Sequence, residues 1–498
     1  MQRIIHKSLV LTAGLLLALG STSCHKDMLD PVPETALSNL VVFDTPSRIE
    51  LQVNGLYAYV KSGSFLGGRY QVYGDIRAND FLNRGTNLVT GTAVWNHTLT
   101  EASQNDVISA WGAGYQAINQ INVFLAGLDA NAAKFVPPAF PANFATQASY
   151  YQGEARLLRA LCYYSLLQLY ARPYADGNGS KPGLPLRLRA ETDDSGNDLA
   201  RSSVAEVYAQ ILSDLNAAEQ LLPASYTAAS GGVPVATLNV TRAHRNTAIA
   251  LKTRVYLTMG RYEDVITEAN KLVPAAAPYV AATGVPHALN ASVGNVFASP
   301  QETAESILSF AFTAQNAPGT QNQLGYYFSP GGEYSLNPAG ILGNTTAWPT
   351  TDARRTAFVV TSGTESFMRK YPTGTPFTDK APVIRYAEVL LSLAEARFRT
   401  QGATDARALA LLNAVRTRSS PTAAYPAFTS VTAAVDAVLQ ERRIEFLAEG
   451  IRNIDIMRLN VPIPGKASVS AVNPSDVLYV WPIPSTELQT NRLMTRNL

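Results

Sequence analysis

The chain contains 498 residues, of which 40 are basic and 38 acidic, and its formal net charge is +2. This balance provides no excess of positive charge for phosphate backbones, which argues against a protein that binds nucleic acid. A chain of this length can bury a large hydrophobic core without disulfides, and it is long enough for two intertwined subregions.

The first 23 residues have the features of an export signal. Arg3 and Lys7 precede an apolar run over residues 9–19, which is shorter than the roughly 20 residues of a membrane-spanning helix. The run is followed by Ser21-Thr22-Ser23-Cys24, which resembles the lipobox of bacterial lipoproteins, where the cysteine is acylated. Ser21 stands where a lipobox usually has Leu, so ordinary signal cleavage is the alternative. We predict a signal peptide over residues 1–23 and lipid attachment at Cys24.

Residues 24–44 contain two prolines and no periodic apolar pattern, which is typical of a tether. Loss of the signal peptide removes two basic residues (40 − 2 = 38) and leaves a mature net charge of zero. No later apolar run reaches membrane-spanning length, so we expect a single folded domain over residues 45–498. Its one cysteine besides Cys24 is Cys162, which lies in a helical apolar pattern and is predicted to be a buried thiol.

From residue 45 to 273, apolar residues recur at spacings of three and four, which predicts a series of helices. Ser203, with Glu206 three residues later, is a candidate helix N-cap. The sequence MGRYEDVITEANKLV resembles the second half of a tetratricopeptide repeat, so we expect an array of helical hairpins. The predicted helices begin at Thr45 and cover residues 105–130, 147–170, 203–222, 242–259 and 262–273.

Two regions lack a periodic pattern. Residues 65–100 are rich in Gly, Asn and aromatic side chains and predict a loop region with one or two short strands at most. Residues 274–380 have a similar character, with one strand-like run at residues 306–310. Long irregular segments in a compact domain are usually functional or mobile, so both regions are candidate binding sites.

Helical patterns return in residues 381–498, over 383–398 and 405–417, and a densely charged segment follows at residues 441–460. Its apolar residues fall on one side of a helical wheel and its acidic residues on the other, which predicts an amphipathic helix. Glutamates one turn apart repel each other unless cations lie beside them, so the pattern favours ion pairs; a solvated charged face is the alternative. Gly450 indicates either a helix end or a close packing point.

The C-terminal blocks Arg442-Arg443-Ile444-Glu445, Glu449-Gly450-Ile451-Arg452 and Asp455-Ile456-Met457-Arg458 look like the C-terminal motif of the SusD/RagB family, nutrient-binding lipoproteins of Bacteroidetes outer membranes. The sequence departs from that motif at Ile451, where the family often has His, and at Asn453-Ile454, where aromatic residues are common. Further blocks agree in the family's order: Trp111 to Asn122, Glu154 to Tyr164, Ile384 to Ala396, and Trp481 to Asn491.

The resemblance implies a mostly α fold, a scaffold of tetratricopeptide-like helix pairs with minor β structure, whose long irregular loops form the ligand face. It implies capture of an oligosaccharide, or of a peptide in the RagB-like branch, for a SusC-like TonB-dependent transporter. The lipid on Cys24 would hold the protein on the outer membrane, facing outward from the cell. It also implies a structural role for the charged motif, with partly buried ion pairs formed by Arg442, Arg443, Glu445, Glu449, Arg452 and Asp455.

The residues themselves indicate no catalytic, metal or cofactor site. The five histidines are scattered, and no motif for a nucleotide or a nucleophilic serine is present. The acidic turn at residues 193–198 lacks the ligand spacing of a calcium loop. We therefore expect no enzyme and no cofactor. A surface glycoside hydrolase, with two carboxylates brought together from distant positions, is one alternative, and a helical scaffold for protein partners is another.

A sugar binder needs flat aromatic side chains for the apolar faces of the rings, flanked by groups that bond hydroxyls. Both irregular regions contain such residues, and we predict ligand contacts from their type and loop placement. The candidates are Tyr73, Arg77, Asn79, Asp80 and Trp95 in the first region and Tyr326, Tyr327 and Trp348 in the second.

Overall fold

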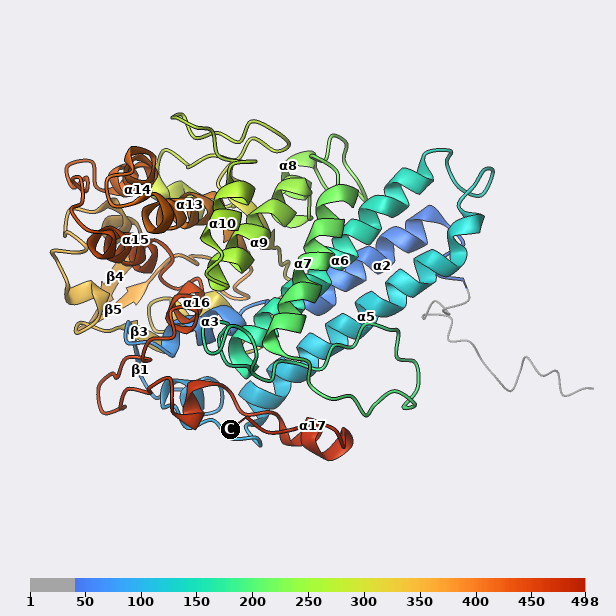
Figure 1. Cartoon of the computed structure of the whole chain (residues 1–498), viewed down its shortest axis with the longest axis horizontal. Helices are drawn as coiled ribbons and strands as arrows, with labels where there is room; N and C mark the ends of the chain where they lie inside the picture. The colour runs from blue at the N-terminus through green and yellow to red at the C-terminus, as the bar shows by residue number, and fades with distance from the viewer. Residues whose placement is uncertain (1–40, 498) are drawn as a thin grey trace, which may run out of the picture.

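The computed structural model describes residues 41–497 (Figure 1). The predicted signal peptide, the lipid attachment site Cys24 and most of the predicted tether lie outside the described residues. Within residues 41–497, no helix combines the length and the apolar character needed to cross a membrane.

The scaffold is a succession of packed helices. The long helices α2, α5, α6 and α7 lie side by side at one end of the molecule, α13 to α15 lie at the other end, and α9 and α10 lie between them (Figure 1). The centre of α6 is buried on every face, and it holds Cys162, which is a free, buried thiol as predicted. The helices up to residue 273 are α2 (Pro46–Val60), α5 (Ser109–Asn131), α6 (Phe144–Tyr170), α7 (Val204–Leu221), α8 (Val235–Thr241), α9 (Arg245–Thr258) and α10 (Tyr262–Ala269).

Local signals in the sequence account for the helix starts. Pro46 occupies the first turn of α2, and the Thr45 hydroxyl accepts a hydrogen bond from the Arg48 amide. Ser203 and Glu206 form the reciprocal capping box that the sequence predicts at the start of α7. The mostly helical fold is therefore confirmed. The C-terminal helices are α13 (Tyr386–Gln401), α14 (Ala406–Ser419), α15 (Val431–Glu445), α16 (Ile451–Arg458) and α17 (Ser485–Thr490).

The irregular regions contain more regular structure than the sequence predicts. Residues 65–100 include two short helices, α3 (Arg69–Ile76) and α4 (Thr92–Trp95), and residues 274–380 include α11 (Leu324–Phe328) and α12 (Ala353–Phe358). The described residues form three antiparallel two-stranded sheets, and the predicted strand at 306–310 is one of their members. The pairs are β1 (Phe81–Asn83) with β3 (Tyr334–Leu336), β2 (Ser306–Phe310) with β6 (Ala381–Arg385), and β4 (Val359–Ser362) with β5 (Glu365–Met368).

The charged segment 441–460 forms two helices, and the boundary at Gly450 is one of the two roles that the sequence indicates for this residue. Helix α15 ends at residue 445 and α16 begins at residue 451. Between them, Gly450 has a φ of +80°. Here Gly450 packs directly on α3, because a Cβ atom added to Gly74 would lie 2.2 Å from the Gly450 carbonyl oxygen. Gly450 is thus both a helix boundary and a close packing point, and a side chain at either glycine would separate the two segments.

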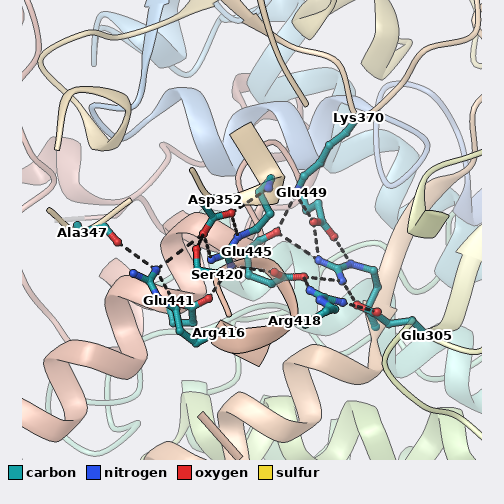
Figure 2. Close-up of polar contacts among 12 residues, drawn as sticks. Glu305, Ala347, Asp352, Lys370, Arg416, Arg418, Ser420, Glu441, Glu445 and Glu449 are labelled. Carbon is teal, nitrogen blue, oxygen red and sulfur yellow. Dashed lines mark hydrogen bonds and ion pairs between the residues drawn. The ribbon is translucent and has the colours of Figure 1, made fainter. Parts of the chain in front are cut away.

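A cluster of ten buried charged side chains joins the C-terminal helices to the irregular region 274–380 (Figure 2). Five carboxylates face five cations, and no side chain of the cluster is more than 5% exposed. Charges of opposite sign in equal number are needed here, because an unpaired buried charge costs several kcal/mol. The members are Glu305, Asp352, Glu441, Glu445 and Glu449, with Arg354, Lys370, Arg385, Arg416 and Arg418.

Glu445, at the end of α15, lies at the centre of the cluster. Its carboxylate is 2.6 Å from Arg418, 3.0 Å from Arg354 and 3.1 Å from Arg385. Burial alone would raise the pKa of Glu445, but the positive charges of these three arginines outweigh it and hold the pKa well below its ordinary value. Glu445 is therefore ionised at neutral pH and depends on cations from three other segments.

The neighbouring residues of the charged motif differ in their surroundings. Glu449 bonds Lys370 at 2.6 Å and Arg385 at 2.8 Å. Asp455 lies 2.9 Å from Arg442, and despite burial the charges of nearby arginines lower its pKa to about 2. Glu449 and Asp455 are therefore both held by buried ion pairs.

Arg452 departs from the prediction. Its side chain is half-buried and forms no ion pair with any residue in the range 41–497, and its pKa is lowered by burial and by the positive charge of Arg443. The turn at residues 446–450 explains the difference, because it interrupts the single helix on which the ion pairs of the motif were predicted.

Two histidines are stacked inside the scaffold. The rings of His244 and His287 are both buried, with centroids 5.2 Å apart and planes inclined by 20°. Burial, together with the charge that its neighbour would carry, lowers the pKa of His244 to about 3; burial lowers the pKa of His287 to about 4. Both imidazoles are therefore neutral in the folded protein at neutral pH.

We expect Glu449→Ala to destabilise the fold by about 3–5 kcal/mol, because it leaves Lys370 and Arg385 with buried charge that is not balanced. Arg452→Ala removes a half-buried side chain without an ion pair and should cost about 1 kcal/mol or less. Urea unfolding of both variants measures the two losses. Equal losses of stability in the two variants would contradict the assignment of Glu449, but not Arg452, to buried ion pairs.

We expect acid to destabilise the protein through the stacked histidines. Because their folded pKa values lie below the unfolded value of 6.5, their contribution is fully present above pH 6.5 and is lost as the pH falls towards 4 and 3. In His287→Asn, a side-chain amide can still donate to the Ala304 carbonyl, but one titrating group is removed. The fall in melting temperature between pH 7 and pH 4.5 should be shallower for this variant, and parallel curves would contradict the prediction.

Candidate functional site

The two irregular regions marked by the sequence meet in space. Strand β1 from the first region pairs with β3 from the second, with Phe81 opposite Leu336. The following loop, residues 84–91, is fixed to the second region by Glu333, whose carboxylate accepts hydrogen bonds from the Asn87 amide at 2.8 Å and the Thr86 hydroxyl at 2.5 Å. We call the surface formed by residues 84–91 and 315–333 the loop junction.

Several predicted ligand-binding residues of the first region instead contact the C-terminal charged motif. Asp80 accepts two hydrogen bonds from Arg443, at 2.5 and 2.8 Å, and the Asn79 side chain accepts a third at 3.0 Å. Arg77 is buried and donates to the Asn453 side chain at 3.0 Å. The predicted ligand contacts of Arg77 and Asp80 are therefore corrected: these side chains fix α3 and β1 to the scaffold. Asn79 is half-buried and is also bonded within the protein.

The two aromatic candidates of the first region are also buried. The Tyr73 hydroxyl donates to Asp106 at 2.8 Å, and burial, followed by the charge of Asp106, raises the pKa of Tyr73 well above its ordinary value. The Trp95 ring nitrogen donates to the Phe81 carbonyl at 2.9 Å. Both rings belong to the hydrophobic core, so the prediction that they stack on a ligand is corrected.

The second region contributes one accessible candidate. Tyr327 and Trp348 are fully buried, and the Tyr327 hydroxyl donates to the Gln321 carbonyl at 2.6 Å, so neither ring presents a face to a ligand. Tyr326 is half-buried and lies edge-on to Phe377, which is also half-buried, with ring centroids 6.5 Å apart. Tyr326 is therefore the aromatic candidate that the loop junction leaves partly open.

Sequence reasoning overlooked the amides next to this tyrosine. Five of the nine residues from 315 to 323 are Asn or Gln, and all five are half-buried or exposed. Amide side chains offer both donors and acceptors, which suits them to sugar hydroxyls. The high density of Asn and Gln in this segment is the signal in the sequence that would have identified these residues. They are Gln315, Asn316, Gln321, Asn322 and Gln323.

The tip of loop 84–91 projects two apolar side chains into solvent. Leu88 is 73% exposed and Val89 60% exposed, while Asn87 at the base of the tip is buried. The Asn87 side-chain oxygen accepts from the Val89 amide at 2.8 Å, so the tip has a defined conformation. Exposed apolar residues on a fixed loop are suited to contact with a ligand or another protein.

The chemistry of the loop junction is that of a binding surface. Its one acidic side chain, Glu333, already bonds loop 84–91, and Glu365 beside the junction bonds Arg84 at 2.9 Å. Within residues 41–497, no group of three or more His, Cys, Asp or Glu side chains is placed to hold a metal ion. What remains accessible is an aromatic pair, a set of amides and an apolar loop tip.

Comparison with known proteins extends over nearly the whole chain. Residues 27–257 match a SusD-like family described as starch-binding and associating with the outer membrane, and residues 252–498 match the SusD family. A SusD superfamily protein from Bacteroides fragilis is 32% identical, and its crystal structure superposes with a TM-score of 0.80, covering 91% of this chain and all of that one.

Two further relatives agree with this result. SusD-like protein P38 from Formosa agariphila is 23% identical over an alignment of length 541, which covers 99% of each chain. The surface glycan-binding protein A from Bacteroides uniformis has the same fold, with a TM-score of 0.67 and 22% identity, covering 91% of this chain and 99% of that one. The family models, the identity to the Bacteroides fragilis protein and the shared fold agree, and the chain belongs to the SusD family.

Proposed function

We propose that this protein captures oligosaccharides at the loop junction and delivers them to a SusC-like TonB-dependent transporter in the outer membrane. The observation that carries the proposal is the pairing of both irregular regions through β1 and β3, next to a segment in which five half-buried or exposed amide side chains precede the partly open Tyr326 in the chain. An aromatic face binds the C–H side of a pyranose ring, and amides bind its hydroxyls. The glycan-binding relative supports a role in binding.

The N-terminal segment fits this role. Acylation at Cys24, followed by the tether of residues 24–44, would attach the folded domain to the membrane while leaving its loops free to face a partner. Contact with a membrane-embedded transporter would hold the domain at the membrane in addition to the lipid. The apolar loop tip at Leu88 and Val89 is a candidate contact for that transporter or for the ligand.

We expect the mature protein to bind a neutral or charged glycan on an array, and Tyr326→Ala to weaken that binding by about tenfold or more. Loss of an aromatic anchor commonly costs 1–2 kcal/mol or more, and 1.4 kcal/mol corresponds to a factor of ten. Titration calorimetry with the glycan that binds best on the array measures the change. Tyr150→Ala is the control, because Tyr150 is half-buried like Tyr326 and lies on α6 beside residues 223–230.

Other outcomes identify the competing functions. Binding of peptides but no glycans would favour the RagB-like alternative, in which the amides bond peptide groups. Cleavage of a bound glycan into products with new reducing ends would show a hydrolase. Equal losses of affinity in Tyr326→Ala and Tyr150→Ala would place the glycan elsewhere. Co-purification with a TonB-dependent transporter from the native membrane tests the partner.

A further inference from the structure

The C-terminal tail closes over two adjoining cavities that share no residue with the loop junction. Their volumes are about 780 Å³ and 530 Å³, which lie within the range of small-ligand sites. Arg496 and Asn497 line both cavities and therefore connect them. We call the two together the tail cavity. Its walls come from the tail, the segment 99–102, and the loop between α6 and α7.

The larger cavity has an excess of positive charge. Four cationic side chains line it, namely Arg172, Lys181, Arg201 and Arg496, and the one carboxylate in its lining is Asp176. That carboxylate bonds Arg172 at 2.7 Å. Arg496 forms an ion pair at 2.6 Å with Glu101, which lines the smaller cavity. Lys181 and Arg201 have no carboxylate within ion-pair distance among residues 41–497, so two positive charges are left over.

Arg201 is held in place by neutral groups. Its guanidinium donates to the Gly183 carbonyl at 2.8 Å, to the Pro182 carbonyl at 2.9 Å and to the Thr495 carbonyl at 3.3 Å. These bonds fix the side chain without neutralising its charge. Burial lowers the pKa of Arg201 to about 10, so the group is still protonated at neutral pH. An anion in the cavity would gain a preorganised cationic partner.

The smaller cavity offers an apolar wall to the same ligand. Val477 and Leu478, 58% and 45% exposed, and the half-buried Leu99 and Pro482 contribute to its lining. An uncharged sugar would make no use of the positive charges of Arg201 and Lys181, and a small inorganic anion would leave the apolar wall uncovered. A pyranose ring with a carboxylate or sulfate group presents a C–H face and an anionic edge, and so matches both parts of the tail cavity.

We propose that the tail cavity is a second carbohydrate-binding site, specific for saccharides that carry carboxylate or sulfate groups. This site goes beyond the loop junction, which it would complement by selecting acidic glycans. It depends on Arg201 and Lys181 for the anionic group and on the apolar wall for the ring.

The experiment is titration calorimetry at 150 mM NaCl with the full mature protein. The probes are a hexamer of galacturonic acid, its methyl ester as a neutral counterpart of the same shape, and a sulfated galactan hexamer. We expect at least one of the two acidic probes to bind and the methyl ester not to bind. The two acidic probes distinguish a carboxylate from a sulfate as the preferred group.

Variants then locate the site. Arg201→Gln should weaken binding of the acidic probe at least tenfold, and Lys181→Gln, at an exposed position that is safe for folding, several-fold. Arg245→Gln, which removes one exposed positive charge at the start of α9, is the matched control and should change nothing. Tyr326→Ala should also leave this binding unchanged, which separates the tail cavity from the loop junction.

The proposal is overturned if neither acidic probe binds, or if the methyl ester binds as well as the acid. Equal losses in Arg245→Gln and Lys181→Gln would show general charge attraction and would also overturn it. Binding of a glutamate hexapeptide with the affinity of the acidic saccharides would exclude a carbohydrate site. If Tyr326→Ala does not weaken glycan binding but Arg201→Gln weakens binding of the acidic probe, the proposal for the loop junction fails and the proposal for the tail cavity is supported.

Discussion

The fold depends on the mutual neutralisation of ten buried charges around Glu445. Removing charged groups from water costs several kcal/mol for each ion, so the cluster is stable only when all its members are present. They come from segments that span residues 305 to 449, including the starts of β2 and α12, the ends of β6 and α14, and helix α15. The irregular region is therefore fixed to the C-terminal helices by charge pairing, in addition to the apolar contacts that join the helices to one another.

The same C-terminal segment also positions the first irregular region. Arg443 bonds Asp80, and the backbones at Gly74 and Gly450 are in direct contact. One stretch of chain thus anchors both regions that build the loop junction. Because each region is held separately to this stretch, the β1–β3 pair has only to align two segments that are already close.

The helices of the scaffold and the family could be read from the sequence, because helical periodicity and local capping signals are short-range properties. The site was predicted less well. In the irregular regions no periodicity distinguishes an inward from an outward side chain, so composition alone suggested that Trp95 and Trp348 were exposed, whereas both are buried. Asp80 and its partner Arg443 are separated by 363 residues, and only the folded structure brings them together. The sequence marked both regions as candidate sites, but it did not predict that β1 and β3 pair, and the amides of 315–323 were missed.

The anchoring of loop 84–91 through Asn87 and Glu333 has a consequence for how such a protein can change. The side chains that hold the loop point inward, while Leu88 and Val89 point outward and have no partner whose loss would weaken the fold. The outward positions 88 and 89 of this short segment thus lie between inward positions that hold it in place. A substitution at either outward position needs no compensating change in the core, so a ligand or partner preference set at the loop tip, as proposed, would diversify at little cost in stability.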